Sequence, residues 1–278
     1  MKNNLLASEK ASLRPRDWAI HRSRLTAFLR EFAPHPLIFA ALSGGDLYGF
    51  PSDDGDFDLR AAHVLPTRDL IVSMLNEGGM DKIPGLTLET TVDRPLPEID
   101  FVSHDIGKFL RLALKGNGYV LEQLLSPLIV ATSEWHAELK AMSRGLITRR
   151  LYFHYRGFFT NQEKLYNNIG SKKVKGLLYQ YRVAMTGIHV LRSGEMDANI
   201  VRLNGIFDLS GVNELVAMKV GAEDMFLTDD APYLAQIKCL EPVLNVAYEE
   251  SRLPDVPSTE TRAAVEDFLL RCRTRLGA

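Results

Sequence analysis

Hydrophobic and polar positions follow two different periods along this chain, and the change of period divides it in two. Short apolar or alternating runs, typical of strands, cover 37–42, 56–65, 86–92 and 98–102. From residue 133 onward, apolar positions recur every three or four residues, as in amphipathic helices, over 133–147, 150–168, 171–192, 212–220, 229–250 and 258–275. The pattern predicts an α+β fold, with a sheet-containing domain over 1–130 and an α-helical domain over 131–278.

Two helices are expected within the first half as well. Residues 15–32 have apolar positions at helical spacing, opposite arginines that are either solvated or in contact with a polyanion. A threonine that can cap a helix begins a second helical pattern over 67–78. In the second half, 196–204 is interpreted as a mobile loop.

A glycine turn follows the first buried strand, within the stretch LSGGDLYGFPSDDGDFDLR, from Leu42 to Arg60. Gly44 and Gly45 can adopt positive φ without steric cost, so the backbone can approach a ligand closely. A short helix expected over 46–50 would leave backbone N–H groups for phosphate oxygens. The turn is therefore a candidate phosphate cradle.

Two carboxylates, Asp56 and Asp58, stand at the start of the strand after this turn. Residues two apart in a strand project from one face, so the two carboxylates are expected together while Phe57 and Leu59 face the core. Two ionised carboxylates repel each other, and a hard cation such as Mg²⁺ relieves that repulsion. The pair predicts a metal site; a solvated acidic turn is the alternative.

A third candidate carboxylate is Asp100. The runs 86–92 and 98–102 alternate and predict a hairpin. Within the second run, Glu98, Asp100 and Val102 share one face, so Asp100 could face the Asp56 and Asp58 pair from a neighbouring strand. The alternative is an exposed strand aspartate.

The order of glycine turn, acidic loop and Asp-x-Asp strand resembles the polymerase-beta-like nucleotidyltransferases. Within that superfamily the chain is most similar to the RlaP-like predicted nucleotidyltransferases, which carry Gly-Ser-x-x-Tyr-Gly followed by Ser-Asp-x-Asp. The matching residues are Gly44 to Gly49 and Asp53 to Asp58, with Gly45 where that family usually has Ser. The segment 105–127 also resembles a family stretch in which a basic amphipathic helix precedes a Gly-Asn turn.

The resemblance implies a nucleotidyltransferase domain over 1–130, with a mixed sheet and flanking helices. It also implies two Mg²⁺ or Mn²⁺ ions held by Asp56, Asp58 and Asp100, with Asp100 as general base for the incoming hydroxyl. The implied substrate is a nucleoside triphosphate. Its contacts are expected from Ser43, Gly44, Gly45 and Tyr48.

Two helix faces are candidates for binding a triphosphate or an RNA backbone. The first carries Lys108, Arg111 and Lys115. The second carries Lys172, Lys175, Tyr179 and Arg182, a basic and aromatic stripe that is the better candidate. Either face is alternatively a solvated or half-buried side of its helix.

Composition narrows the class of protein. The chain is 46% hydrophobic and 24% charged, without an apolar run of transmembrane length or a secretory signal pattern, so we expect a cytoplasmic protein with no membrane contact. Cys239 and Cys272 give neither a disulfide framework nor a zinc spacing, which fits a reducing compartment. The formal net charge of −2 argues against indiscriminate nucleic-acid binding but allows a local basic groove.

The function expected from these features is transfer of a nucleoside monophosphate from a nucleoside triphosphate to an acceptor hydroxyl, with release of pyrophosphate. The family name refers to RNA repair and favours an RNA end as acceptor, while protein, small-molecule and antibiotic acceptors stay open. The alternative is a catalytically inactive binding or regulatory module with the same fold. Such a module is expected to lose at least one of the three carboxylates.

Overall fold

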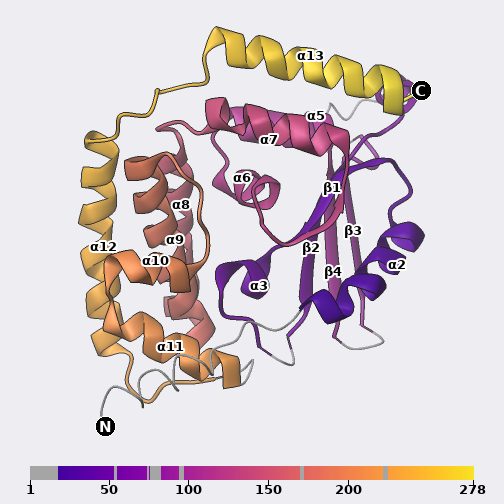
Figure 1. Cartoon of the computed structure of the whole chain (residues 1–278). Helices are drawn as coiled ribbons and strands as arrows, with labels where there is room; N and C mark the ends of the chain where they lie inside the picture. The colour runs from indigo at the N-terminus through magenta and orange to yellow at the C-terminus, as the bar shows by residue number, and fades with distance from the viewer. Residues whose placement is uncertain are drawn as a thin grey trace.

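A computed structural model describes residues 18–52, 55–73, 75, 83–93, 97–169, 172–221 and 225–278 (Figure 1). A five-stranded sheet with helices on both faces forms the N-terminal half, and a group of helices lies beside it (Figure 1). The last helix, α13 (Thr259–Leu276), crosses back over the sheet half and contacts α5 and α7. The α+β fold predicted from the sequence is confirmed.

The sheet is mixed, with the strand order β3-β4-β2-β1-β5. The strands are β1 (Leu37–Leu42), β2 (Phe57–His63), β3 (Thr87–Val92), β4 (Ile99–Asp105) and β5 (Ile129–Thr132). β2 and β4 run parallel, and the other neighbouring strands are antiparallel. β3 and β4 form the predicted antiparallel pair, and the parallel pairing brings the first residues of β2 beside those of β4.

Alternation along the strands gives each face of the sheet its own helical layer. On one face, Ala40 and Phe101 pack with α2 (Arg22–Phe32). On the other face, Phe39 packs edge-on against Phe109, with the ring centroids 5.5 Å apart. This second layer consists of α5 (Ile106–Leu114), α6 (Gly118–Leu124) and α7 (Glu134–Leu146). Both faces of the sheet are therefore buried.

The helical half is built around α9 (Val174–Ser193), which contacts α8, α10, α11 and α12. These neighbours are α8 (Leu151–Ile169), α10 (Ile200–Phe207), α11 (Ser210–Gly221) and α12 (Ala231–Glu249). One continuous cluster of buried apolar side chains extends from β1 through these helices to α13. The division into two domains stays a prediction, and its boundary at residue 130 falls inside β5.

Several predicted elements differ from the observed ones. The loop expected over 196–204 is wrong in its second half, because the Asn199 side chain accepts hydrogen bonds from two backbone N–H groups and begins α10. The short helix after the glycine turn is α3 (Gly44–Tyr48), which begins two residues earlier than expected. The expected 15–32 helix appears as η1 (Trp18–His21) and α2, and the 67–78 helix as α4 (Thr67–Ser73). Leu75 lies in a turn after α4, and the other remaining parts of these two predictions lie outside the described residues.

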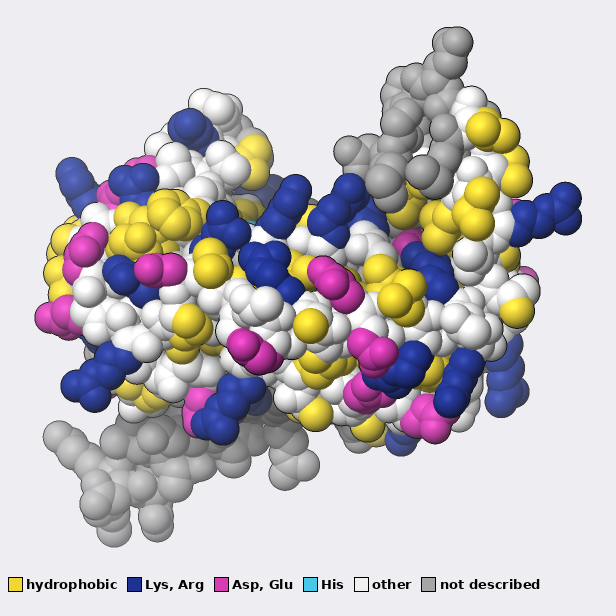
Figure 2. Space-filling model, turned by 90° about the horizontal axis from the view of Figure 1, so that it is seen from above, with side chains coloured by type: hydrophobic (Ala, Val, Ile, Leu, Met, Phe, Trp, Pro, Cys, Tyr) yellow, Lys and Arg dark blue, Asp and Glu magenta, His cyan; other side chains and the backbone are white. Residues whose placement is uncertain are grey.

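Charged side chains on the face that α13 covers are mixed in sign. Seen from above, Lys and Arg side chains are interspersed with Asp and Glu (Figure 2). Arg271 of α13, for example, bonds both Glu138 of α7 and Asp267 of its own helix. Among the described helices, none combines the length and the apolar character that crossing a membrane requires.

A buried ion pair connects the two halves of the molecule. Arg182 of α9 has no exposed surface, and its Nη1 lies 2.7 and 2.8 Å from the two carboxylate oxygens of Glu122 in α6. The Tyr155 hydroxyl donates to the same carboxylate at 2.9 Å. The guanidinium also lies over the ring of Tyr48, 4.0 Å from its centroid. The pair therefore holds α9, α6 and the glycine-turn helix α3 together.

Removing one partner of this pair should destabilise the protein strongly. Arg182→Met leaves the Glu122 carboxylate buried without its cation, and we expect the free energy of unfolding to fall by about 3–5 kcal/mol. Adding Glu122→Gln should restore part of that loss. Urea unfolding measures both changes.

The matched control is Arg202→Met, because Arg202 pairs with Asp197 at 2.7 Å on the surface with about half of its side chain exposed. We expect a loss below about 1 kcal/mol there. Strict additivity of Arg182→Met and Glu122→Gln would show that the buried groups do not interact energetically.

Candidate active site

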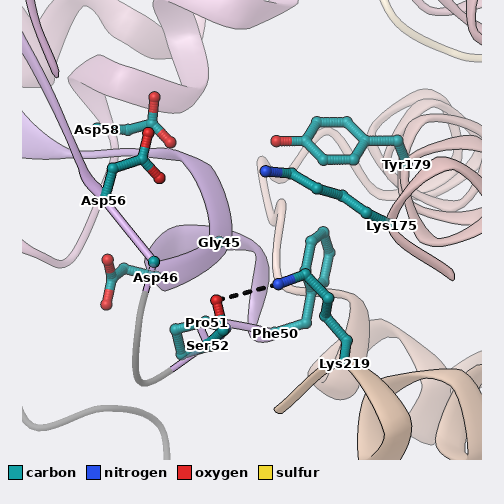
Figure 3. A pocket seen from close by; sticks show the side chains of 11 residues that line it. Gly45, Asp46, Phe50, Pro51, Ser52, Asp56, Asp58, Lys175, Tyr179 and Lys219 are labelled. Atoms are coloured by element: carbon teal, nitrogen blue, oxygen red, sulfur yellow. Dashed lines mark hydrogen bonds between the residues drawn. The ribbon is translucent and has the colours of Figure 1, made fainter. Parts of the chain in front are cut away.

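Asp58 and Asp100 lie side by side at the start of the two parallel strands. Each is the second residue of its strand, and the register of β2 and β4 places them opposite each other. Asp58 is largely buried, with 22% of its side chain exposed, and Asp100 is 33% exposed. Asp56 precedes β2 by one residue and is exposed. Figure 3 shows the Asp56 and Asp58 carboxylates close together, facing Lys175 and Tyr179 of α9.

Arg60 bridges the two strand carboxylates. Its Nη2 lies 2.6 Å from Asp58 Oδ1 and 2.8 Å from Asp100 Oδ2. Its Nη1 donates to the backbone oxygen of Asp100 at 2.8 Å. Only 8% of Arg60 is exposed, so this guanidinium is a built-in counter-charge to both carboxylates. The sequence reasoning did not select Arg60, although its position two residues after Asp58 places it on the same strand face.

The glycine turn is packed directly against Asp58. Gly44 has a φ of +57°, and a Cβ atom at this position would lie 1.7 Å from Asp58 Oδ2. The backbone N–H of Ser43 donates to the backbone oxygen of Asp58 at 2.8 Å. The sequence predicts that Gly44 lets the backbone approach a ligand closely. In the structure it also lets the backbone approach the Asp58 carboxylate, and only glycine fits there.

Burial and neighbouring charge perturb Asp58. Burial raises the pKa of this carboxyl from its ordinary value of 3.8 to about 6, although the Arg60 cation opposes the rise. This value also includes smaller contributions from the Asp56 and Asp100 carboxylates, which raise the pKa, and from Lys175, which lowers it. An ionised Asp58 is thus under-compensated in the protein alone, and a cation would stabilise it.

Two lysines reach the hollow beside these carboxylates. The hollow encloses about 20 Å³ and is lined by Gly45, Ser52, Asp56 and Asp58 together with Lys175 and Lys219. Lys219 of α11 is only 1% exposed, and its Nζ donates to Ser52 Oγ at 3.0 Å (Figure 3). The sequence reasoning missed Lys219; its one signal was a single lysine within an apolar helical run. This space is sufficient for one water molecule or ion.

The second predicted basic stripe does not form a continuous surface. Lys175 and Tyr179 line the hollow, whereas Arg182 is enclosed in the core and paired with Glu122. Lys172 forms an ion pair with Asp230 at 2.9 Å and does not line the hollow. The predicted contact between Arg182 and the nucleotide is not supported, because this side chain is buried and has no exposed surface for a ligand.

The remaining predicted residues lie at the edge of the site or away from it. Tyr48 is 1% exposed, and its hydroxyl lies 3.5 Å from the hydroxyl of buried Ser43. Both side chains therefore support the turn from within the core. Lys108 and Arg111 line a different cavity with Asp105, at the opposite end of β4 from Asp100. Asp53 lies outside the described residues.

The carboxylates present are suited to a divalent cation. Among the described residues, no three His, Cys, Asp or Glu side chains are gathered as a metal cluster. Asp56 and Asp58 nevertheless supply adjacent carboxylates at the hollow, the hard oxygen donors that Mg²⁺ takes in ones or twos alongside substrate phosphates. Asp100 is also near, but one of its oxygens is bonded to Arg60. Asp56 and Asp58 therefore fit the ion best.

A mixed sheet with paired strand aspartates behind a glycine turn, joined to a helical part, defines a polymerase-beta-like nucleotidyltransferase fold. The chain belongs to the family described as RlaP, RNA repair pathway DNA polymerase beta family, whose model matches residues 20–271. It is also similar to the uncharacterized protein MJ0002 of Methanocaldococcus jannaschii. The two are 32% identical over 227 residues, which cover 80% of this chain and 88% of the relative.

The raised pKa of Asp58 should appear in the stability of the metal-free protein. Because the folded state holds this proton more tightly than the unfolded state, stability from this group falls as pH rises from about 4 to about 6. Asp58→Asn does not titrate. The difference in free energy of unfolding, variant minus wild type, should therefore grow across that window and be constant on either side.

Urea unfolding in EDTA at a series of pH values measures this difference. Observation of the Asp58 carboxyl by NMR gives the pKa directly. A difference that does not change between pH 4 and 6 would contradict the perturbed carboxyl.

Proposed function

We propose that the protein is a divalent-metal-dependent nucleotidyltransferase that moves a nucleoside monophosphate from a nucleoside triphosphate to an acceptor hydroxyl. The observation that carries this proposal is the placement of Asp58 between a second strand aspartate, Asp100, and a hollow lined by Lys175 and Lys219. Family membership supports the same chemistry. Carboxylates for a metal and cations for phosphates thus meet at one point.

The residues divide into a metal side and a phosphate side. Asp56 and Asp58 would hold Mg²⁺ or Mn²⁺, which would supply positive charge to the reacting phosphate oxygens. Lys175 would bind the β or γ phosphate at the edge of the hollow, next to the backbone of Gly45, and the nearly buried Lys219 would add positive charge behind it. A second ion would need Asp100, one of whose carboxylate oxygens is bonded to Arg60.

Asp100 is the proposed general base. The acceptor oxygen attacks the α-phosphorus, and the bond from that phosphorus to the oxygen shared with the β-phosphate breaks. Pyrophosphate leaves with the electron pair, and the hydroxyl proton passes to the Asp100 carboxylate. An RNA end is the favoured acceptor because the family description refers to RNA repair. We also propose a cytoplasmic location, because both cysteines are free thiols, as is usual in a reducing compartment.

A second candidate function is a catalytically inactive nucleotide-binding module of the same fold. The observation in its favour is the Arg60 bridge, which engages two of the three carboxylates that catalysis would use. The two candidates differ in whether a covalent product forms.

Transfer of label separates the two candidates. We expect wild type, with Mg²⁺ or Mn²⁺ and mixed RNA, to attach label from at least one α-³²P nucleoside triphosphate to an acceptor. Label from the γ-³²P form should instead appear in pyrophosphate. Asp58→Asn should reduce transfer by about 10²-fold or more, because the charge that holds the cation is lost.

Lys172→Ala is the matched control for Lys175→Ala, since Lys172 pairs with Asp230 outside the hollow. Only Lys175→Ala should weaken triphosphate binding. Nucleotide binding without transfer to any acceptor would favour the inactive module, and full activity of Asp58→Asn would exclude the proposed site.

A further inference from the structure

A second cavity opens onto Asp58. Its lining differs in kind from that of the hollow beside Lys175 and Lys219, which we call the lysine hollow. It encloses about 340 Å³ and is lined by Tyr119, His154, Phe158 and Tyr179, reaching Gly44 and Asp58. We call it the aromatic pocket. Among the described residues that line it there is no Lys or Arg, whereas the lysine hollow has two. The two spaces share Asp58 and Tyr179.

The aromatic pocket is built to receive a flat, uncharged group. Five aromatic side chains line it: the nearly buried Tyr48 of α3, and four partly exposed ones, Tyr119 of α6, His154 and Phe158 of α8 and Tyr179 of α9. Such rings stack on nucleobases through their faces. The volume is within the range of about 300–1,000 Å³ that is usual for small-molecule sites. An additional phosphate would find no cation on this lining.

Two polar groups at the pocket are available for a hydrogen-bonding partner. His154 Nε2 is buried, and no hydrogen-bond partner for it lies among the described residues. Burial, with a contribution from the Arg182 cation, lowers the pKa of His154 to about 4, so the ring is neutral at pH 7. Asn117 uses its side-chain oxygen to cap α6, accepting from the N–H groups of Tyr119 and Val120. Its amide N–H₂ group is the donor end that is not used in this cap.

The position of Asp58 between the two spaces matches the order of groups in a nucleoside triphosphate. In that molecule the α-phosphate, where the proposed reaction occurs, lies between the anionic β and γ phosphates and the uncharged nucleoside. Lys175 at the edge of the lysine hollow offers positive charge to the first part, and the aromatic pocket suits the second. Asp58 lines both and so lies where the α-phosphate would be.

We propose that the aromatic pocket binds the nucleobase and ribose of the nucleoside triphosphate, with the base stacked on Phe158 or Tyr179 and read by His154. This inference rests on the proposed function and specifies how its substrate is held.

Equilibrium binding tests this assignment without requiring catalysis. The ligands are ATP, GTP, CTP, UTP and inorganic tripolyphosphate, each with Mg²⁺, and the dissociation constants are measured by calorimetry. At least one nucleotide should bind wild type at least about 10-fold more tightly than tripolyphosphate. Phe158→Ala should weaken that nucleotide by roughly 5- to 150-fold, the range for loss of one stacked base, and leave tripolyphosphate unchanged.

Phe153→Ala is the matched control, because Phe153 lies on the same helix, is 63% exposed and does not line the aromatic pocket. It should change neither affinity. Phe158→Leu removes the ring but keeps an apolar side chain in its place, so it is a second variant with less risk of a folding defect. Thermal unfolding of each variant would reveal such a defect. His154→Ala should reduce the spread of affinities among the four nucleotides, an effect that a purely structural role would not produce.

The outcomes separate this inference from the proposed function. If nucleotides bind no better than tripolyphosphate, or if Phe158→Ala weakens both ligands equally, the base site is wrong while the phosphate site stands. If Phe158→Ala weakens only the binding of a short RNA, the aromatic pocket belongs to the acceptor and the assignment is overturned. If neither nucleotides nor tripolyphosphate bind, the proposed function and this inference both fail.

Discussion

The buried pair of Arg182 and Glu122 is the interaction on which the arrangement of the site depends. It fixes α9 against α6, and the guanidinium covers Tyr48 from the glycine-turn helix. The same helix α9 carries Tyr179 and Lys175, one and two turns before Arg182 respectively, and both side chains point toward the carboxylates (Figure 3). Moving α9 away from α6 would leave an uncompensated charge in the core, because neither Arg182 nor Glu122 has another charged partner among the described residues. The site therefore depends on how the two halves pack.

A second constraint is the concentration of negative charge at the start of β2 and β4. Two adjacent aspartates in a largely buried position would repel, and Arg60 compensates them in the protein without ligands. That compensation is incomplete, since the pKa of Asp58 is still raised to about 6. The remaining imbalance is the physical reason for expecting a cation at Asp56 and Asp58, and it links the strand register to the proposed chemistry.

Local sequence pattern was sufficient for features that depend on one or two strands. The alternation at Asp58 and Asp100 placed both on one face, and the structure pairs them in register. Helical spacing, in contrast, identifies a shared face but not what covers it. Because α9 is surrounded by other helices, the predicted stripe ends in the core at Arg182. Arg60 and Lys219 were missed because a single charge within an apolar run shows its partner only after folding.

The most direct test of this account is a crystal structure with Mn²⁺ and a non-hydrolysable nucleoside triphosphate analogue. Anomalous scattering locates the ion independently of the protein atoms. The account predicts Mn²⁺ bound to Asp56 and Asp58, with the β or γ phosphate against Lys175. An ion and triphosphate bound elsewhere on the protein, with Arg60 still joining Asp58 to Asp100, would contradict it.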